Sequence, residues 1–469
     1  MTILDEIAAK TKGRVAEAKR ICPNPMMANG GKPVFRRMDL PRGVNTAGDF
    51  PFEKALRKPG LSFITEVKKA SPSKGIIAES FPYAQIAEDY DNAGADCISC
   101  LTEPYWFMGS NKYLTEIKSR VNIPVLRKDF TVDDYMIYEA KAIGADAILL
   151  ICAILDPVQL HDYQQLADEL GLSAIVEAHS AEEIEMGLKA GARILGVNNR
   201  NLKDFTVDVT NAGNLRSLVP DDVLFISESG VRTREDILVA EQMRADAVLV
   251  GETMMRSENK SKKLRELSGR PPRVKICGMM TEEDIRKVNG LHPDYVGFVF
   301  AKTRHYISYE QAKKLKSMLD PSIQAVGVFV DTPVPEIIDL LREGIIDMAQ
   351  LHGHETNEDI EEIRLETGKK VIKAVILKEN DDIKKAADYP AADYLLFDAG
   401  KGSGRTFRWD LLKTYAGDKP YFLAGGLHPE NVREGVLVTD PFAVDVSSGV
   451  EDTDLSKNYE KMKAFIAEV

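Results

Sequence analysis

ITEVKKASPSKG, residues 64–75, joins an apolar strand to a loop of small polar residues. Glu66 and Lys68 are two residues apart, so on a strand both side chains point to the same face. Ser71 and Ser73 in the loop offer hydroxyl groups to an anion. An exposed ion pair of little energetic value is the alternative interpretation. Because similar strand ends recur along the chain, we favour a site for an anionic substrate.

Short apolar segments alternate with helical segments from this stretch to about residue 256. Several helical segments end in a small-residue hinge such as NAGAD or AIGAD, after which the next strand begins. The eight strands are predicted at residues 64–69, 97–103, 124–130, 147–154, 173–179, 194–200, 224–230 and 247–253. Continuous apolar strands separated by helices predict a parallel sheet, and eight such units predict a closed (β/α)8 TIM barrel.

The segments on either side of this barrel differ from it in pattern. Residues 1–20 place Ile3, Leu4 and Ile7 at helical spacing, which predicts an amphipathic helical extension of the first barrel. Residues 257–272 are charged and end in two prolines, which predicts a final helical turn and then a linker.

The alternation restarts after this linker, in fewer residues and without an evident direct sequence repeat. Its eight strands are predicted at residues 273–278, 295–300, 324–330, 348–353, 370–375, 394–399, 421–426 and 442–449. We therefore predict an α/β protein of two fused TIM barrels, with domains at 1–256 and 273–469.

Composition excludes several classes of protein. The chain has 469 residues, too many for one ordinary domain, and a net charge of −12, which favours neither nucleic acid nor a membrane surface. Five scattered cysteines suggest no disulfide framework and favour the cytoplasm. Cys97 and Cys100 have the spacing of a metal or redox pair, but three residues apart on a strand they face opposite sides. We expect them to be buried thiols.

Several predicted strands of the first barrel end in a reactive polar residue. These residues are Lys68, Lys128, Glu177, Asn198 with Arg200, and Glu228. The carboxyl ends of the strands build the active site in such barrels, and solvation alone does not explain so many similar strand ends.

Glycine and serine residues after the last strands predict a phosphate site. Ser229 and Gly230 follow the seventh strand and Gly251 follows the eighth, where barrel enzymes often hold phosphate. Glycines allow backbone N–H groups to approach an oxyanion closely. Ser71 after the first strand is expected at the same end of the barrel.

Lys68 and Lys128 are candidates for acid catalysis. A free lysine has a pKa of about 10.4, so we expect burial or a like-charged neighbour to lower the pKa of the catalytic lysine. The lysines and glutamates of one barrel mouth can perturb each other in this way. A structural ring of ion pairs is the alternative.

The motifs EVKKASPSKG, LRKDF, VEAH, GVNNRNL, SESGV and VGET together resemble the indole-3-glycerol-phosphate synthase family over residues 1 to about 256. That family closes the indole ring of 1-(o-carboxyphenylamino)-1-deoxyribulose 5-phosphate with loss of CO2 and water. The resemblance implies that Lys128 is the general acid on the substrate carbonyl and Glu177 the acid/base of dehydration. Glu66 and Glu228 would support Glu177, and Lys68 could share proton transfer.

The same resemblance implies the residues that bind substrate. Asn198 and Arg200 would face the anthranilate part, and Ser229 with Gly251 the phosphate. Glu252 departs from the small hydroxyl residue often found after that glycine. Because a carboxylate repels phosphate, we expect Glu252 to point away and only its backbone to contribute.

Two residues of the second half combine acid and base chemistry. Cys277 ends the first strand and Asp398 the sixth. A thiol with a pKa near ~8.5 that nearby donors lower can act as a base, and a carboxyl group can donate the matching proton. Segments 424–426 and 445–451 have the position and composition of a phosphate site.

KICG, VGFVF, GVFV, QLHG, FDAGKGSG, GGL and DVSSGVE resemble the phosphoribosylanthranilate isomerase family over residues 273–469. That family converts N-(5-phosphoribosyl)anthranilate, an aminoaldose, into the aminoketose by an Amadori rearrangement. The resemblance implies Cys277 as general base and Asp398 as general acid, with His352 lining the site. The implied phosphate ligands are Gly425, Gly426, Ser448 and Gly449.

One departure concerns the anthranilate carboxylate. The family usually has arginine immediately before the YIS-like segment, where this chain has His305, with Arg304 one residue earlier. Either Arg304 reaches the carboxylate after a shift of the loop, or His305 substitutes. We favour Arg304.

The two implied reactions are consecutive, because the product of the isomerase is the substrate of the synthase. We therefore expect a bifunctional enzyme of tryptophan biosynthesis that acts on phosphorylated anthranilate sugars as a monomer. No metal-ligand cluster or dinucleotide motif is evident, and we expect no cofactor, nucleic acid or membrane partner. The alternatives are that only the first barrel is active, or that the chain is a binding scaffold without catalysis.

Overall fold

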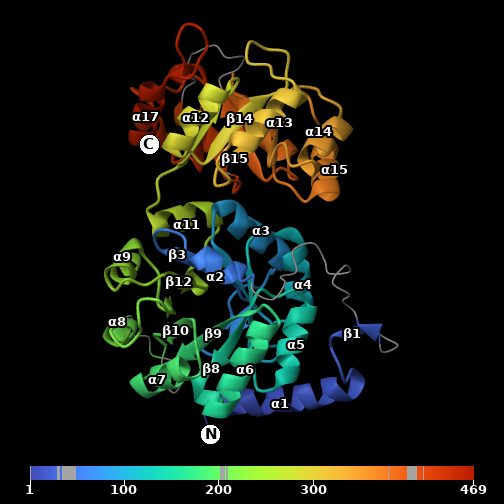
Figure 1. Ribbon diagram of the computed structural model, residues 1–469, viewed down its shortest axis with the longest axis vertical. Coiled ribbons are helices and arrows are strands. Elements are labelled where there is room, and N and C mark those ends of the chain that lie inside the picture. The colour runs from blue at the N-terminus through green and yellow to red at the C-terminus, as the bar shows by residue number, and fades with distance from the viewer. Residues whose placement is uncertain are drawn as a thin grey trace. The chain divides into compact units, whose positions relative to one another are not determined.

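The computed structural model describes residues 2–28, 32–33, 49–200, 206, 210–378, 380–398, 409–415 and 417–469. The chain forms two compact units, Met1–Gly269 and Arg270–Val469. Each unit is built around a closed barrel of eight parallel strands surrounded by helices (Figure 1). The prediction of two fused TIM barrels is therefore confirmed.

The first barrel has the strand order β10-β11-β12-β3-β6-β7-β8-β9. Its strands are β3 (Ser62–Val67), β6 (Cys97–Leu101), β7 (Val125–Lys128), β8 (Ala147–Ile151), β9 (Ser173–Ala178), β10 (Ile194–Asn198), β11 (Leu224–Glu228) and β12 (Ala247–Val250). The ring closes where Val250 of β12 pairs with Thr65 of β3. The eight predicted positions are all occupied by strands.

Two helices of this unit precede the first barrel strand, and the others follow successive strands. They are α1 (Ile3–Ile21), α2 (Pro51–Leu56), α3 (Tyr83–Ala93), α4 (Asn111–Arg120), α5 (Asp134–Ala142), α6 (Pro157–Glu169), α7 (Ala181–Lys189), α8 (Thr210–Arg216), α9 (Arg234–Gln242), α10 (Glu252–Arg256) and α11 (Lys260–Ser268), with the 3-10 helix η1 (Cys152–Ile154). Two-residue strands form separate antiparallel pairs, β1 (Met27–Ala28) with β2 (Lys32–Pro33) and β4 (Ala70–Ser71) with β5 (Gly75–Ile76).

Side-chain oxygens at the helix starts explain where several helices begin. Ser110, Asp133 and Ser180 each accept a hydrogen bond from a backbone N–H in the first turn of α4, α5 and α7. Asp156 does the same for α6, and Pro157 occupies the first helical position, where no N–H donor is required. These local signals place each helix after its strand.

The alternation of side chains along the strands separates two hydrophobic layers. Ile64 and Cys97 belong to a cluster of barrel-strand and α2 side chains, whereas Phe63 and Cys100 belong to the larger cluster that includes residues of the surrounding helices. Cys97 and Cys100 are therefore buried free thiols on opposite faces of β6, as expected.

The second barrel has the order β13-β14-β15-β16-β17-β18-β19-β20 and closes through β13 and β20. Its strands are β13 (Arg273–Cys277), β14 (Tyr295–Val299), β15 (Gln324–Phe329), β16 (Met348–Leu351), β17 (Val371–Ile376), β18 (Tyr394–Asp398), β19 (Tyr421–Leu423) and β20 (Ala443–Val446). Its helices are α12 (Glu282–Leu291), α13 (Tyr309–Met318), α14 (Val334–Arg342), α15 (Asn357–Thr367), α16 (Val432–Thr439) and α17 (Tyr459–Ala467), with the 3-10 helices η2 (Asn380–Asp388), η3 (Trp409–Thr414) and η4 (Ser448–Val450).

The segment predicted as a final turn and linker, 257–272, contains the complete helix α11. This helix packs against α3 and α9 within the first unit, and the division between the units falls at Gly269 and Arg270. The first unit thus extends beyond residue 256.

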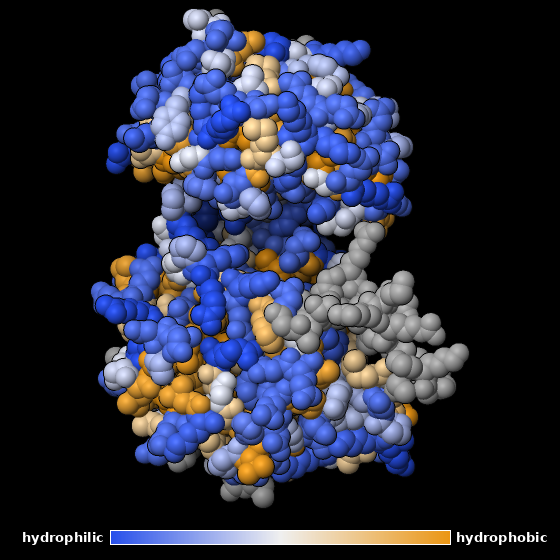
Figure 2. Space-filling view, viewed as in Figure 1, coloured by the Kyte–Doolittle hydropathy of each residue, from blue (hydrophilic) through white to orange (hydrophobic). Residues whose placement is uncertain are grey.

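Hydrophilic residues cover most of the face shown in Figure 2, with hydrophobic residues in smaller patches between them. Among the described helices, none combines the length and hydropathy that a membrane span requires.

Candidate active sites

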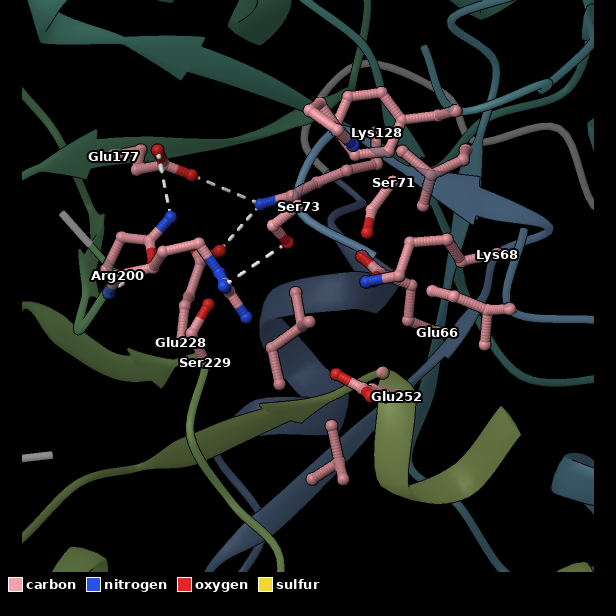
Figure 3. Close-up of a pocket in the computed structure, with 18 of the residues that line it drawn as sticks. Glu66, Lys68, Ser71, Ser73, Lys128, Glu177, Arg200, Glu228, Ser229 and Glu252 are labelled. Atoms are coloured by element: carbon pink, nitrogen blue, oxygen red, sulfur yellow. Dashed lines mark hydrogen bonds and ion pairs between the residues drawn. The ribbon is translucent and has the colours of Figure 1, made fainter. Parts of the chain in front are cut away.

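The carboxyl ends of the first barrel's strands open into a cavity of about 310 Å³. Side chains from all eight strands and from the loops after several of them reach it, and Figure 3 shows part of this set. The predicted site residues that line it are Glu66, Lys68, Ser71, Lys128, Glu177, Asn198, Arg200, Glu228, Ser229 and Gly251. Every residue proposed for the first site therefore lies at one cavity.

Lys128 lies between two glutamates of this cavity. Its Nζ atom donates hydrogen bonds to Glu228 Oε2 at 2.6 Å and to Glu177 Oε2 at 3.2 Å (Figure 3). Asn198 donates to the other Glu177 oxygen at 3.4 Å. Both glutamates are buried, whereas Oε1 of Glu228 has no hydrogen-bond partner among the described residues.

The two carboxylates beside Lys128 have opposite pKa shifts. Burial raises the pKa of Glu228 to about 7, in spite of Lys128, and the negative charge of Glu177 adds to this effect. Burial also acts on Glu177, but Lys128 and His179 outweigh it and hold the pKa of Glu177 below its usual value. Glu177 is therefore ionised at neutral pH, whereas Glu228 titrates near neutral pH.

The pKa of Lys128 differs from the expectation. Burial acts to lower this pKa, but the charges of Glu228, Glu177 and Glu66 outweigh burial and raise it above the ordinary lysine value. The predicted lowering is wrong for the substrate-free site because three carboxylates surround one ammonium group. Lys128 is accordingly protonated throughout the neutral range.

Glu66 and Lys68 form the second ion pair of the cavity. Their side chains point to the same face of the strand end, and Lys68 Nζ donates to Glu66 Oε1 at 2.5 Å. Ser99, opposite Glu66 on β6, donates to Glu66 Oε2 at 3.2 Å. The pair is mostly buried, unlike the exposed surface pair considered as the alternative.

The predicted phosphate segments also meet at this cavity. Ser229 and Gly230 have positive φ values of 69° and 97°, so the backbone turns sharply directly after β11. Arg200 Nη1 donates to Ser73 Oγ at 3.4 Å, which brings the loop after β10 to the loop after β3 (Figure 3).

Glu252 does not point away from the site as expected, but lines the cavity. Its Oε1 accepts a hydrogen bond from Arg256 at 2.9 Å, one turn later on α10. Burial acts to raise the pKa of Glu252, but the hydrogen bond from Arg256 and the charges of Lys74 and Lys68 outweigh burial and lower it. Arg256 thus compensates the negative charge of Glu252, which follows Gly251 of the predicted phosphate site.

The N-terminal helix α1, predicted as an amphipathic extension of the first barrel, contributes to one side of the cavity. Ile3, Leu4 and Ile7 are lining residues. Arg14 Nη2 lies 2.9 Å from both carboxylate oxygens of Asp129, the residue after Lys128. Sequence reasoning missed this contact because the two residues are 115 positions apart.

Two aromatic residues of the cavity were also missed. The rings of Phe107 and Phe130 lie 6.0 Å apart, and both line the cavity. Glu103 is fully buried and accepts hydrogen bonds from the backbone N–H groups of Tyr105, Trp106 and Phe107, which fixes their loop. The aromatic run PYWF directly after the second predicted strand could have indicated Phe107, and Phe130 is itself the last residue of the third predicted strand.

The second barrel brings its predicted acid and histidine together. Asp398 ends β18, and its Oδ2 lies 3.7 Å from His352 Nε2. Gln350 Nε2 lies 3.3 Å from the other ring nitrogen of His352. Burial, opposed by Asp398, lowers the pKa of His352, so the ring is neutral at neutral pH. Residues 399–404 of the FDAGKGSG motif lie outside the described residues.

Cys277 ends β13 and is buried beside Val299, Ala301 and Val328. Burial raises the pKa of the thiol, although the positive charge of Lys275 opposes this shift. The expected lowering of this pKa is therefore wrong for the substrate-free barrel.

A buried ion pair that sequence reasoning missed links the adjacent strands β13 and β20. Lys275 Nζ donates to Asp445 Oδ2 at 2.7 Å, and Lys275 is fully buried. The charges of both residues act on His352, and Lys275 also acts on Cys277. Both lie within otherwise apolar strands, a signal that was available in KIC and VDV.

The two segments of the second barrel that are predicted to bind phosphate lie in contact. Gly425 and Gly426 have positive φ values of 85° and 67°. A Cβ atom on Gly449 would overlap the carbonyl oxygen of Leu427 and lie 3.0 Å from His428 Cα. Glycine at 449 thus allows the segment that contains Ser448 to pack against the turn after β19.

Arg304 and His305 face different surroundings. His305 Nε2 lies 2.8 Å from Glu451 Oε1, and its side chain is 11% exposed. The Arg304 side chain is 52% exposed, and its contact with Glu451 is longer, at 3.4 Å. This arrangement favours Arg304 as the residue able to reach a substrate carboxylate.

Among the described residues, no group of three or more His, Cys, Asp and Glu side chains has an arrangement that could hold a metal ion.

Comparisons with known proteins assign both halves to families. Residues 4–267 match the family model of indole-3-glycerol phosphate synthase, and residues 274–468 match that of N-(5'-phosphoribosyl)anthranilate isomerase. The indole-3-glycerol phosphate synthase of Ruminiclostridium cellulolyticum is 52% identical over 57% of this chain and 99% of its own length. The multifunctional tryptophan biosynthesis protein of Schizosaccharomyces pombe is 34% identical over 99% of this chain and 66% of its own length.

A crystal structure of phosphoribosylanthranilate isomerase from Thermotoga maritima is 39% identical, covers 42% of this chain and 98% of its own, and has a TM-score of 0.40. The two family matches fit two catalytic barrels and not the alternative in which only the first is active. The chain therefore belongs to the indole-3-glycerol phosphate synthase family in its first half and to the phosphoribosylanthranilate isomerase family in its second, and it is a bifunctional enzyme of tryptophan biosynthesis.

Proposed function

We propose that the second barrel converts N-(5-phosphoribosyl)anthranilate into 1-(o-carboxyphenylamino)-1-deoxyribulose 5-phosphate with Cys277 as general base and Asp398 as general acid. An Amadori rearrangement opens the sugar ring by protonating the ring oxygen and removes the proton from the adjacent sugar carbon. Asp398 supplies the first proton, and the Cys277 thiolate accepts the second. His352, 3.7 Å from Asp398, lines the site on the acid side.

The phosphate of this substrate binds where the loops after β19 and β20 meet. Gly425, Gly426, Ser448 and Gly449 supply backbone N–H groups, and Ser448 also supplies its hydroxyl. The contact between Gly449 and Leu427 supports this assignment, because it brings the two loops to one point. Arg304 pairs with the anthranilate carboxylate.

The first barrel converts the aminoketose into indole-3-glycerol phosphate with loss of CO2 and water. Lys128 protonates the substrate carbonyl, and the aromatic ring then attacks the carbonyl carbon. Glu177 acts as acid/base in the dehydration, supported by Glu66 and Glu228, and Lys68 shares proton transfer. The single observation that carries this proposal is the placement of Lys128 between Glu177 and Glu228 in one cavity.

Substrate orientation in the first barrel follows from the groups around this centre. Ser71, Ser229 and Gly251 lie on the phosphate side, and Asn198 with Arg200 faces the anthranilate part. The cavity of about 310 Å³ has the size of a small-molecule site. We further propose that the enzyme is a cytoplasmic monomer, for which size-exclusion chromatography with light scattering is the test.

Separate replacements test the two assignments in the full-length protein. Lys128→Ala should abolish ring closure and spare isomerisation, and Cys277→Ala should do the reverse. Phosphoribosylanthranilate is supplied in one assay to measure isomerisation, and the aminoketose is supplied in a second assay to measure ring closure. Loss of both activities in either variant, or retention of ring closure without Lys128, would contradict the assignments.

A further inference from the structure

Three glycines of the barrels lie against side chains with proposed catalytic roles on the neighbouring strand. The pairs are Gly196 with Glu228, Gly251 with Glu66 and Lys68, and Gly297 with Cys277. We propose that these glycines are positioning residues, because each catalytic group occupies the space that a side chain at the glycine would fill. The inference rests on the catalytic roles proposed above.

Backbone conformation does not explain these glycines. None of the three has the positive φ that favours glycine over other residues. Gly196 and Gly297 lie inside the strands β10 and β14, where glycine weakens a strand because it contributes no side chain and loses more entropy. Space for a neighbouring group remains as the physical reason for glycine at these positions.

Gly196 makes room for the carboxylate of Glu228 on the adjacent strand β11. A Cβ atom at residue 196 would overlap Glu228 Oε1. That oxygen is buried and has no hydrogen-bond partner in the described part of the chain, and the second oxygen binds Lys128 at 2.6 Å. A methyl group at 196 therefore displaces the carboxylate and breaks its alignment with Lys128.

Gly251 has the same relation to the second ion pair of the cavity. A Cβ atom there would lie 2.6 Å from Glu66 Oε1 and 3.0 Å from Lys68 Nζ, both below normal contact distance. The atoms of this ion pair are 2.5 Å apart, so the methyl group would meet both partners at once. Gly251 thus sets the position of a catalytic pair in addition to its proposed contact with phosphate.

Gly297 repeats the arrangement in the second barrel. It pairs with Cys277 across β13 and β14, and a Cβ atom would lie 2.5 Å from Cys277 Sγ. The added Cβ atom would also lie 3.0 Å from Cys277 Cα, so rotation of the Cys277 side chain alone would not relieve the overlap. Glycine at 297 therefore leaves free the space that the Cys277 thiol occupies.

Gly327 provides a matched control. It lies within β15, and an added Cβ would be 2.7 Å from Ile346 Cδ1 and 2.8 Å from the Phe329 ring. The crowding is similar, but the obstructed groups are hydrophobic core residues. Gly327→Ala should lower stability without a change in the pH dependence of either reaction.

The decisive experiment compares Gly196→Ala with the wild type in the full-length protein. Displacement of a catalytic group by about 1 Å can cost on the order of 10²-fold, so we expect kcat for ring closure to fall by that order and KM to change much less. The neutral limb of the pH–rate profile should shift, because the environment of Glu228 changes. Isomerisation should be unaltered.

A second arm tests whether the effect passes through Glu228. The carboxylate of Glu228→Asp is one methylene group shorter and clears the added methyl group. Gly196→Ala should therefore cost clearly less in the Glu228→Asp background than in the wild type. Equal costs in both backgrounds, or wild-type kcat and pH profile in Gly196→Ala, would overturn the inference.

Failure of the inference is distinguishable from failure of the proposed function. If Glu228→Gln leaves ring closure intact, the role of Glu228 is wrong; if only Gly196→Ala leaves it intact, the glycine has no positioning role. Should Gly196→Ala not fold, Gly297→Ala decides by the same criterion. Its kcat for isomerisation should fall while ring closure from supplied aminoketose continues, and unchanged isomerisation would overturn the inference.

Discussion

Lys128 Nζ and Glu228 Oε2 lie 2.6 Å apart at the ends of β7 and β11, 100 residues apart in the chain. This contact leaves the second oxygen of Glu228 buried without a partner among the described residues. Burial raises the pKa of Glu228 to about 7, whereas Lys128 and Glu177 remain charged at that pH. Glu228 is therefore the carboxyl group of this triad that titrates near neutrality.

We predict that Glu228 sets the neutral limb of ring closure. Glu228 pairs with Lys128 and supports Glu177 in its ionised form, so kcat/KM should rise with pH through about 7 and then level off. Glu228→Gln should lower the rate by about 10²-fold or more and remove this limb. A profile of kcat/KM against pH for both proteins checks this, and an unchanged limb in the variant would assign the titration to another group.

We predict that Arg14 supports ring closure by attaching α1 to the barrel. Arg14→Met removes the closer of the two arginines beside Asp129, which is 2% exposed, whereas Arg127 remains 3.5 Å away. Loss of a hydrogen-bonded contact to a charged group costs roughly 2 kcal/mol of the free energy of unfolding. KM for the aminoketose should also rise, because Ile3, Leu4 and Ile7 line the cavity from the same helix. Denaturant unfolding and synthase kinetics measure the two effects.

The matched control is Arg20→Met on the same helix. The pair of Arg20 with Glu17 is largely exposed, so its loss should change the free energy of unfolding by less than about 1 kcal/mol. Isomerase KM should not change in either variant. An equal loss of free energy of unfolding in Arg14→Met and Arg20→Met would show that the Arg14–Asp129 contact stabilises the fold no more than an exposed ion pair.

The positions of the strands could be predicted because each is an uninterrupted apolar segment between helical ones. The candidate residues at the first cavity could be predicted because parallel strands bring their carboxyl ends to one edge. The Arg14–Asp129 contact could not, since nothing in either local sequence specifies a partner 115 residues away.

The directions of several pKa shifts also could not be predicted from the sequence. Whether burial or neighbouring charge prevails depends on distances that spacing does not give, as Lys128 and Cys277 show. The Arg256 partner of Glu252 is different, because a spacing of four residues on a helix already indicates a contact. Sequence reasoning could have found that pair.

His179 should stabilise the first barrel at low pH more than at high pH. Its ring lies 3.6 Å from Glu177 and 3.4 Å from Glu183. Glu177 in turn accepts a hydrogen bond from Lys128, which also binds Glu228. Burial acts to lower its pKa, but Glu183 and Glu177 outweigh burial and raise it. The stabilisation is therefore complete below the unfolded-state pKa of about 6.5 and is lost as pH rises through the folded-state pKa.

The measurement is the difference in free energy of unfolding between the wild type and His179→Gln at a series of pH values. We expect a difference of about 1 kcal/mol at pH 6 that shrinks towards pH 8. A difference that does not depend on pH would mean that the ring acts only by packing.

Arg304 and His305 should give different defects in the isomerase. Arg304→Ala should raise KM for phosphoribosylanthranilate with little change in melting temperature, because its side chain is half-exposed and its contact with Glu451 is long, at 3.4 Å. His305→Gln should instead lower the melting temperature, because His305 pairs with buried Glu451 at 2.8 Å. The reverse pattern would transfer the carboxylate-binding role to His305.

The ion pair of Lys275 and Asp445 should affect both the stability of the second barrel and isomerisation. Lys275→Met leaves Asp445 buried without its cation, so it should destabilise this barrel by roughly 3 kcal/mol. Lys275 also acts to lower the pKa of Cys277, so the thiolate population should fall further in this variant. Isomerisation should decrease while ring closure from supplied aminoketose persists.

The double variant Lys275→Met with Asp445→Leu distinguishes these two effects. Replacing a buried ion pair by apolar side chains of similar volume is often neutral or stabilising, so the double variant should regain most of the lost stability. It should not regain isomerisation, because the positive charge beside Cys277 is still absent and the thiol is still harder to ionise. Calorimetry and the dependence of kcat/KM on pH measure both; recovery of activity together with stability would show that Lys275 serves the fold alone.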